Sequence, residues 1–215
     1  MNIKEIKKRV KSFGNKWYYY YNFGGIEVRE KFRKDKTSGM YNWNKKIKPI
    51  VSELSNGFKS PCLFDIGCNM GMYAHMMTKM GIKVYAMDRN IKMAEFYSQY
   101  VVENLHEDWK VDLIQSDISE SNISLLDVNI VTMFCVLYHI SPNEDLVLDN
   151  LNNICPNHTY IVLQGNNPRL KRKPPQKIAG IKGMVELLEN HNYETVVFNW
   201  KGYPKPVVVG KRKYE

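Results

Sequence analysis

Short apolar runs recur along the chain from Pro61 onward, separated by longer stretches whose apolar residues have helical spacing. Short runs rich in β-branched and aromatic residues predict buried strands. We expect seven strands, over Cys62–Ile66, Lys83–Met87, Val111–Gln115, Val128–Phe134, Tyr160–Leu163, Tyr193–Trp200 and Pro206–Gly210. The intervening stretches predict helices over Met72–Met80, Ile91–Leu105, Asn143–Ile154 and Ile178–Asn190.

The order of these elements predicts the fold class. Strands that alternate with helices form a parallel sheet with helices on both faces. Only Lys201–Lys205 separates the last two strands. A return that short makes an antiparallel hairpin, because a parallel return needs a longer crossover. We therefore expect an α/β, Rossmann-like fold with a seven-stranded, mostly parallel sheet whose last strand is antiparallel.

The first 60 residues follow a different pattern. Ile3–Phe13 has the spacing of an amphipathic helix, Gly24-Gly25 predicts a turn, and Tyr41–Leu54 predicts another helix. The aromatic run Trp17–Tyr21 either packs on the core as alternate side chains of a strand, or forms a lid or stacking surface. We expect residues 1–60 to be a helical and aromatic cap and residues 61–215 to be the main domain.

The net charge of +9 is unevenly distributed along the chain. Residues 1–60 hold 15 Lys/Arg and 5 Asp/Glu (+10), residues 61–165 hold 5 and 13 (−8), and residues 166–215 hold 11 and 4 (+7). Basic flanks around an acidic centre suit a polyanionic partner such as RNA. The alternative is a set of solvated faces that serve solubility alone.

The composition excludes several classes of protein. No run of 18 apolar residues occurs, so we expect no membrane insertion. The four cysteines are scattered without a C-x-x-C pair and the five histidines are dispersed, so we expect neither a disulfide framework nor a metal site. The first residues are too charged for a signal peptide, and we expect a cytoplasmic protein. The sequence leaves the oligomeric state open.

The turn after the first strand carries the first candidate site. Asp65 stands near the end of that strand and begins the pattern D-x-G-x-x-x-G, with glycines at 67 and 71. Glycine at the first position lets the backbone turn sharply and approach a ligand, and the second lets the next helix pack closely, with its N–H groups facing the ligand. The leading acid suits a ligand that carries an amine and a sulfonium. The candidate contacts are Asp65, Gly67, Cys68, Asn69 and Gly71; the alternative is glycines that serve packing only.

Two further acids follow the next two strands. Asp88 lies 23 residues after Asp65, where a carboxylate can accept both hydroxyls of a ribose, and Arg89 beside it is another candidate contact. Asp117 can accept from an adenine amino group while Ile118 packs on the ring. Either acid alone could be a helix N-cap or a loop residue. Three acids after consecutive strands meet at one sheet edge, which is where ligands bind in open α/β sheets.

The fourth strand ends at Phe134, which should border the reacting group. Cys135 after it suits a small buried wall better than a nucleophile. His139 is a candidate general base for an acceptor hydroxyl, or a structural residue that caps the loop before Pro142. Tyr138 is the second catalytic candidate.

Basic and aromatic residues outside the turn are candidates for substrate binding. The segment after the fifth strand carries Arg169 and Lys171 among prolines, and it either grips phosphates or forms a surface loop. Trp17 and Trp43 are the aromatic candidates on the N-terminal side.

With these residues assembled, the chain resembles the class I S-adenosylmethionine-dependent methyltransferases. It looks, more narrowly, like the tRNA wobble-uridine carboxymethyl- or methyltransferase type and its small relatives. The stretches that carry the likeness are LFDIGCNMGMY at 63–73, VLYHISP at 136–142, GYPKPVVVG at 202–210, Tyr41–Lys45, and Trp17-Tyr18 before Gly24-Gly25-Ile26. The resemblance implies donor contacts from Asp65, Gly67 and Asn69 to the amino-acid end, from Asp88 to the ribose, and from Asp117 and Ile118 to the adenine.

The resemblance also implies S-adenosylmethionine as the cofactor and S-adenosylhomocysteine as the product. Carboxymethyl-transferring members need extra cationic and tyrosine contacts for the donor's carboxylate, and these do not align securely here. We therefore expect ordinary methyl transfer, with O-methylation of an RNA (tRNA-like) acceptor as the leading hypothesis. The alternatives are a methyltransferase for a small molecule, sugar or lipid precursor, and a non-catalytic module that binds S-adenosylmethionine.

Overall fold

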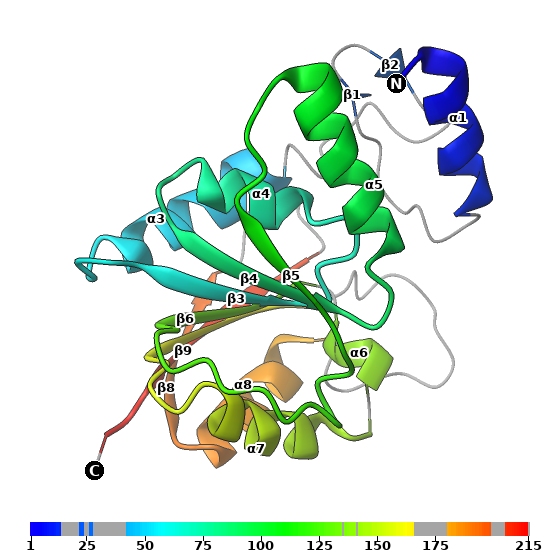
Figure 1. The fold of residues 1–215 in the computed structure, drawn as a ribbon. Helices are drawn as coiled ribbons and strands as arrows, with labels where there is room; N and C mark the ends of the chain where they lie inside the picture. The colour runs from blue at the N-terminus through cyan, green and yellow to red at the C-terminus, as the bar shows by residue number, and fades with distance from the viewer. Residues whose placement is uncertain are drawn as a thin grey trace.

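The computed structural model describes residues 1–13, 22–23, 26–27, 42–134, 136–140, 142–165, 180–198 and 205–214. Its centre is a seven-stranded sheet in the order β5-β4-β3-β6-β7-β9-β8 (Figure 1). The strands are β3 (Cys62–Ile66), β4 (Lys83–Asp88), β5 (Val111–Gln115), β6 (Ile130–Phe134), β7 (Tyr160–Gln164), β8 (Tyr193–Phe198) and β9 (Val207–Arg212). β3 to β7 run parallel, while β9 is antiparallel to both β7 and β8. The expected Rossmann-like sheet with an antiparallel last strand is confirmed.

The strand bounds differ from the expected ones mainly at the C-terminus. β3 and β5 have the expected bounds, and β6 begins at Ile130 instead of Val128. β9 begins after Pro206, which has no N–H to give to a ladder. It continues to Arg212, because Lys211 pairs with Tyr160 on one side and Arg212 pairs with Tyr193 on the other. Two charged residues therefore extend a strand that the apolar pattern ends at Gly210.

Helices cover both faces of the sheet (Figure 1). One face carries α3 (Lys48–Ser55), α4 (Met72–Thr78) and α5 (Lys92–Tyr100). The other carries α6 (Leu137–Ile140), α7 (Glu144–Ile154) and α8 (Ile181–Asn190). The expected helix over Ile91–Leu105 is α5 followed by a π-turn, η3, over Val101–Leu105. The short α6 was not expected, and α7 begins with Asn143 as its N-cap.

Alternate side chains of the strands feed two apolar layers. Phe64 and Val131 face the α7 and α8 side, together with Leu148 and Leu188. On the opposite side, Leu63, Val84 and Ile130 pack with Trp43, Ile47, Ile50, Val51 and Met77. Burial on both faces explains why the strands are continuous apolar runs instead of alternating ones.

The N-terminal part contributes to the same core. Trp43 begins the π-turn η2 (Trp43–Ile47), which leads into α3, and both pack against the sheet. The helix α1 (Ile3–Ser12) lies beside α5, where Ile6 is buried and Phe13 packs against Phe96 (Figure 1). The two-residue strands β1 (Asn22–Phe23) and β2 (Ile26–Glu27) pair antiparallel, while the expected Gly24-Gly25 turn lies outside the described residues. A cap boundary at residue 60 stays a prediction. Across the described ranges, no helix has the length and apolar character needed to span a bilayer.

Candidate functional site

The turn between β3 and α4 contains three residues in the left-handed backbone region. Gly67 has φ 71°, Asn69 has φ 55° and Gly71 has φ 73°. Glycine enters this region without a steric penalty, and asparagine is one of the few other residues found there. The D-x-G-x-x-x-G spacing is therefore required by the backbone path of the turn.

The two glycines also leave room that a side chain would fill. A Cβ on Gly67 would overlap Cγ2 of Val136, which lies just after β6. A Cβ on Gly71 would lie 3.1 Å from the ring of Trp109, which precedes β5. Gly67 thus keeps the turn close to the end of β6, while Gly71 allows α4 to pack closely against the Trp109 ring, as the sequence pattern indicated.

Most backbone amides of this turn are paired within the protein, whereas the expectation that the N–H groups at the start of α4 face the ligand stays a prediction. Four of these amides donate within the protein: Gly67 and Cys68 to the Met87 carbonyl at 2.8 and 3.0 Å, Asn69 to Asp88 Oδ2 at 2.9 Å, and Gly71 to the Cys68 carbonyl at 2.9 Å. Amides that are already paired do not recognise an anion. This turn suits a ligand with a cationic group, because carbonyl and carboxylate oxygens can accept hydrogen bonds from that group.

Asp65 lies beneath the turn in a buried position. Its side chain is 3% exposed and accepts a hydrogen bond from Thr132 Oγ1 on the neighbouring strand β6, at 2.8 Å. Burial raises the pKa of Asp65 to about 7, the nearby Asp88 carboxylate adds to that rise, and the Thr132 hydroxyl opposes it. A cationic group of a ligand at this place would favour the ionised carboxylate.

Asp88 and Asp117 stand at the ends of β4 and β5. Asp88 Oδ2 accepts from the Asn69 amide and its Oδ1 accepts from the Asn90 amide at 3.1 Å, which joins the turn to β4. Asp117 Oδ1 accepts from the amide and hydroxyl of Ser119, at 3.0 and 2.8 Å. The structure thus brings the three sequence-predicted acids to one edge of the sheet.

Arg89 forms an ion pair with Asp117, the acid that follows the neighbouring strand β5. Its Nη2 lies 2.6 Å from Asp117 Oδ2, and its side chain is 65% exposed. Burial alone would raise the pKa of Asp117, but the Ser119 hydrogen bonds and the Arg89 guanidinium hold it below its usual value. Asp117 is therefore an ionised acceptor whose position is fixed by β4 as well as by its own loop.

Two other predicted donor contacts are mostly covered by the protein. Ile118 is 4% exposed and packs in the layer with α7, where its carbonyl accepts from Asn150 Nδ2 at 3.3 Å. Cys68 is buried, and burial raises the pKa of its thiol well above the usual range. Both residues shape the edge of the sheet, and a direct contact with a ligand stays a prediction for each.

Aromatic rings line the carboxyl end of β6. Phe134 packs edge-on against Tyr73 of α4, with ring centroids 5.4 Å apart. Tyr73 in turn stacks on Trp43, with centroids 5.6 Å apart. Trp43 is only 1% exposed, so the structure places this predicted substrate contact behind Tyr73 and within the core.

Three polar side chains that the sequence did not single out meet beside these rings. Asn42 and Gln164 exchange amide hydrogen bonds of 3.3 and 3.1 Å, and Asn42 Nδ2 also donates to the Tyr73 hydroxyl at 3.0 Å. Gln164 is the last residue of β7 and pairs in register with Phe134. Its position at a strand end was the only available sequence signal, since nothing in the pattern indicated its partners.

The remaining candidates lie outside this cluster or outside the described residues. His139 is exposed on α6, and its backbone amide donates to the Val136 carbonyl at 2.7 Å. Tyr138 belongs to the same helix, but its side chain is not among those described. Trp17, Cys135, Arg169 and Lys171 also fall outside the described residues. The roles proposed for them stay predictions.

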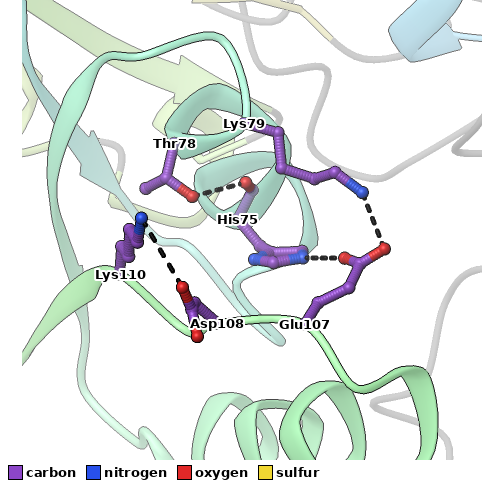
Figure 2. Close-up of a pocket in the computed structure, with 6 residues that line it drawn as sticks. All are labelled: His75, Thr78, Lys79, Glu107, Asp108 and Lys110. Atoms are coloured by element: carbon purple, nitrogen blue, oxygen red, sulfur yellow. Dashed lines mark hydrogen bonds and ion pairs between the residues drawn. The ribbon is translucent and has the colours of Figure 1, made fainter.

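A separate pocket of about 260 Å³ lies between α4 and the segment before β5 (Figure 2). Glu107 contacts two of the other lining residues. Its Oε2 lies 3.0 Å from His75 Nε2, and its Oε1 lies 2.8 Å from Lys79 Nζ. These contacts hold the pKa of Glu107 below its usual value. The His75 ring stacks on Trp109, with centroids 5.4 Å apart. None of the predicted donor contacts lines this pocket, which opens near the amino end of β5; its other lining residues are Thr78, Asp108 and Lys110.

Metal ligation finds no support in the described ranges, where no group of three or more His, Cys, Asp or Glu side chains could hold an ion. The site therefore consists of an acidic row at the ends of β3, β4 and β5, and an aromatic and amide cluster at the ends of β6 and β7.

Comparisons with known proteins agree with this arrangement. Residues 64–163 match the family model described as a methyltransferase domain. The fold is similar to magnesium protoporphyrin IX methyltransferase from Synechocystis PCC 6803 with bound S-adenosylmethionine (TM-score 0.63, 16% identity, 99% of this chain and 98% of that one). It is also similar to an S-adenosylmethionine-dependent methyltransferase from Aquifex aeolicus (0.60, 20%, 77% and 88%) and to the bifunctional kinase-methyltransferase WbdD (0.64, 14%, 94% and 46%). A search of curated proteins gives no match.

Proposed function

We propose that this chain transfers a methyl group from S-adenosylmethionine to a hydroxyl oxygen, since residues 64–163 match a methyltransferase-domain model and the fold is similar to that of S-adenosylmethionine-dependent methyltransferases. The observation that carries the proposal is the row of acids at the carboxyl ends of three adjacent parallel strands, Asp65, Asp88 and Asp117. S-adenosylmethionine is the cofactor, and S-adenosylhomocysteine is the product.

S-adenosylmethionine would lie along this row with its charged end over β3. Asp65 and the carbonyls of the turn would accept hydrogen bonds from its ammonium group, beside Asn69 and Gly67. Asp88 accepts the ribose hydroxyls, because a carboxylate has about four acceptor positions and the two backbone amides use only two of them. Asp117 would accept a hydrogen bond from the adenine amino group, and the ion pair with Arg89 fixes the position of its carboxylate.

Methyl transfer is an in-line displacement. The acceptor oxygen forms a bond to the methyl carbon, the carbon–sulfur bond breaks, and its electron pair neutralises the sulfonium. The hydroxyl proton leaves to water or to a base. Because the leaving group is neutral sulfur, positioning can supply much of the rate, up to about 7–11 kcal/mol in well-oriented systems.

His139 is the proposed base for the hydroxyl proton, with Tyr138 as the second candidate. The helix α6 that carries both begins at Leu137, three residues after the end of β6 and next to Val136, which lies close to Gly67 of the turn. An exposed imidazole can take a proton from the acceptor and pass it to solvent near neutral pH.

RNA is the proposed acceptor, and the charge distribution supports it. The helix α1 presents Lys4, Lys8 and Arg9 as exposed residues, and it lies beside α5 (Figure 1). Arg169 and Lys171 would add phosphate contacts, and Trp17 would stack on a base. Among the described residues, Cys62, Cys68 and Cys155 are free thiols, which is consistent with the proposed cytoplasmic location.

A small-molecule, sugar or lipid-precursor acceptor is the second candidate. The uncharged amide and aromatic cluster of Asn42, Tyr73 and Gln164 favours it, because such groups recognise neutral polar ligands without help from phosphate contacts. One similar structure is a porphyrin methyltransferase, which shows that this fold accepts a small molecule in at least one protein.

The experiment uses tritiated S-adenosylmethionine with total RNA and, separately, with the low-mass fraction of the same cell extract. We expect label in RNA, and binding to RNA that weakens at least about tenfold between roughly 50 and 200 mM salt. Label in the low-mass fraction alone would replace RNA by the second candidate. Tight donor binding with no label in either fraction would make the chain a non-catalytic binding module.

A further inference from the structure

The side chains of Asn42, Tyr73 and Gln164 form a joined polar group, which we call the amide–tyrosine cluster. Asn42 lies just before η2, Tyr73 lies in the first turn of α4, and Gln164 ends β7. Residues separated by 31 and 122 positions in the sequence therefore meet through three hydrogen bonds of 3.0 to 3.3 Å. A contact between three separate elements at a strand end is costly to order, which indicates a defined role for it.

The position of the cluster places it at the methyl end of the donor. The strand order is β5-β4-β3-β6-β7, and the proposed adenine, ribose and ammonium contacts lie at the ends of β5, β4 and β3. Tyr73 lies two residues after Gly71 and contacts Phe134 at the end of β6, while Gln164 ends β7. The cluster therefore continues the row on the side opposite the adenine, where the acceptor has to enter.

The Tyr73 ring is fixed from three directions. Trp43 stacks on it, Phe134 meets it edge-on, and Asn42 Nδ2 donates to its hydroxyl oxygen. Because the phenol oxygen accepts from the Asn42 amide, the position of the Tyr73 hydroxyl group is fixed. Immobilisation before the acceptor arrives is what an in-line displacement requires from a positioning group.

We propose that Tyr73, held by Asn42 and Gln164, is a positioning residue that orients a neutral hydroxyl acceptor against the donor's methyl group. All three side chains are uncharged and can both donate and accept, which matches a hydroxyl better than a carboxylate or a phosphate. The same chemistry is presented by a ribose hydroxyl of RNA and by the hydroxyl of a small molecule. This inference rests on the proposed methyl transfer and specifies the acceptor side of that site.

The test compares Tyr73→Phe and Asn42→Ala with wild type in the transfer assay, using total RNA and the low-mass fraction as separate probes. We expect Tyr73→Phe to lower the initial rate at least tenfold, with a raised KM for the fraction that accepts the label. The Kd for S-adenosylmethionine should stay within about threefold of wild type. Asn42→Ala should act in the same direction with a smaller effect, since Trp43 and Phe134 still hold the ring.

Tyr214→Phe is the matched control, because it removes a phenol oxygen from an exposed residue bonded to Thr159 at the other end of β7. Thermal unfolding of each variant separates misfolding from a positioning effect. The inference is overturned if folded Tyr73→Phe transfers label within twofold of wild type. If wild type binds donor but labels neither fraction, the proposed methyl transfer itself fails, and the inference fails with it.

Discussion

The backbone amide of Asn69 donates to Asp88 Oδ2 at 2.9 Å, so the turn after β3 is tied directly to the acid that ends β4. The same carboxylate also accepts from the Asn90 amide at 3.1 Å. Asn69 stands in the left-handed region, with φ 55°, and this bond helps to hold it there. Asp88 therefore shapes the turn, in addition to its proposed role as the acceptor of the ribose hydroxyls.

Replacing Asp88 should affect both roles. We expect Asp88→Ala to lower the affinity for S-adenosylmethionine by roughly 10- to 150-fold, because hydrogen bonds to a charged group contribute about 1.5–3 kcal/mol. Loss of the Asn69 contact should also lower the free energy of unfolding of the ligand-free protein by about 1–3 kcal/mol. Isothermal titration calorimetry measures the first effect, and denaturant unfolding measures the second.

The matched control is Asp112→Ala, which removes a carboxylate from an exposed position of β5. It should leave both quantities near the wild-type values, because surface charges contribute little. Equal affinity losses in the two variants would mean that net charge, and not the position of Asp88, determines donor binding.

Gly67 and Gly81 can be compared to separate two reasons why a position requires glycine, which are a positive φ and a lack of space for a side chain. Both have positive φ, 71° and 81°, but a Cβ on Gly81 meets nothing within 4 Å, while one on Gly67 overlaps Val136. Gly81→Ala should therefore cost only the backbone strain, about 1–2 kcal/mol. Gly67→Ala should cost that amount and a further 1–3 kcal/mol or so for the overlap, and it should abolish donor binding.

The double variant Gly67→Ala, Val136→Ala tests this division. Removing the Val136 methyl groups should restore the stability of the Gly67 variant toward that of Gly81→Ala, as measured by denaturant unfolding. An unchanged stability would show that the contact with the end of β6 does not limit this position.

The sheet and the acidic row could be predicted because both are local patterns repeated along the chain. Buried strands such as Cys62–Ile66 are continuous apolar runs, and Asp65, Asp88 and Asp117 each stand at or just after a strand end. The rule that parallel strands present their carboxyl ends at one edge then brings the acids together without any knowledge of contacts.

The amide–tyrosine cluster could not be predicted, because its members have ordinary local surroundings. Asn42 and Gln164 are 122 residues apart, and only the tertiary fold makes them partners. The partners of the turn amides could not be predicted for a similar reason, since the Met87 carbonyl that accepts from two of them belongs to the next strand. Spacing specifies where a backbone turns, whereas hydrogen-bond partners depend on the neighbouring element.

Asp65 should make the ligand-free protein less stable as the pH rises. Burial raises the pKa of Asp65 from 3.8 to about 7, and Asp88 adds to the rise, so between these values the folded state binds a proton that the unfolded state has lost. Stability then falls as the pH increases through this window and levels off above pH 7, the opposite of the usual behaviour of a paired carboxylate. At about 1.4 kcal/mol per pKa unit, wild type should lose roughly 2.5–3 kcal/mol between pH 5 and pH 8 through this group.

Asp65→Asn removes this titration, so its stability should change less than that of wild type between the two pH values, as measured by urea unfolding without donor. Donor binding should show the converse trend, because the donor's ammonium group needs the ionised carboxylate: wild-type affinity should rise from pH 6 to pH 8, and that of Asp65→Asn should be weak and flat. Thr132→Val serves as the control for the direction of the shift, since loss of the hydroxyl that donates to Asp65 Oδ1 should move the rise in donor affinity to higher pH. Parallel pH profiles for wild type and Asp65→Asn would place the proton on another group and remove Asp65 from ammonium recognition.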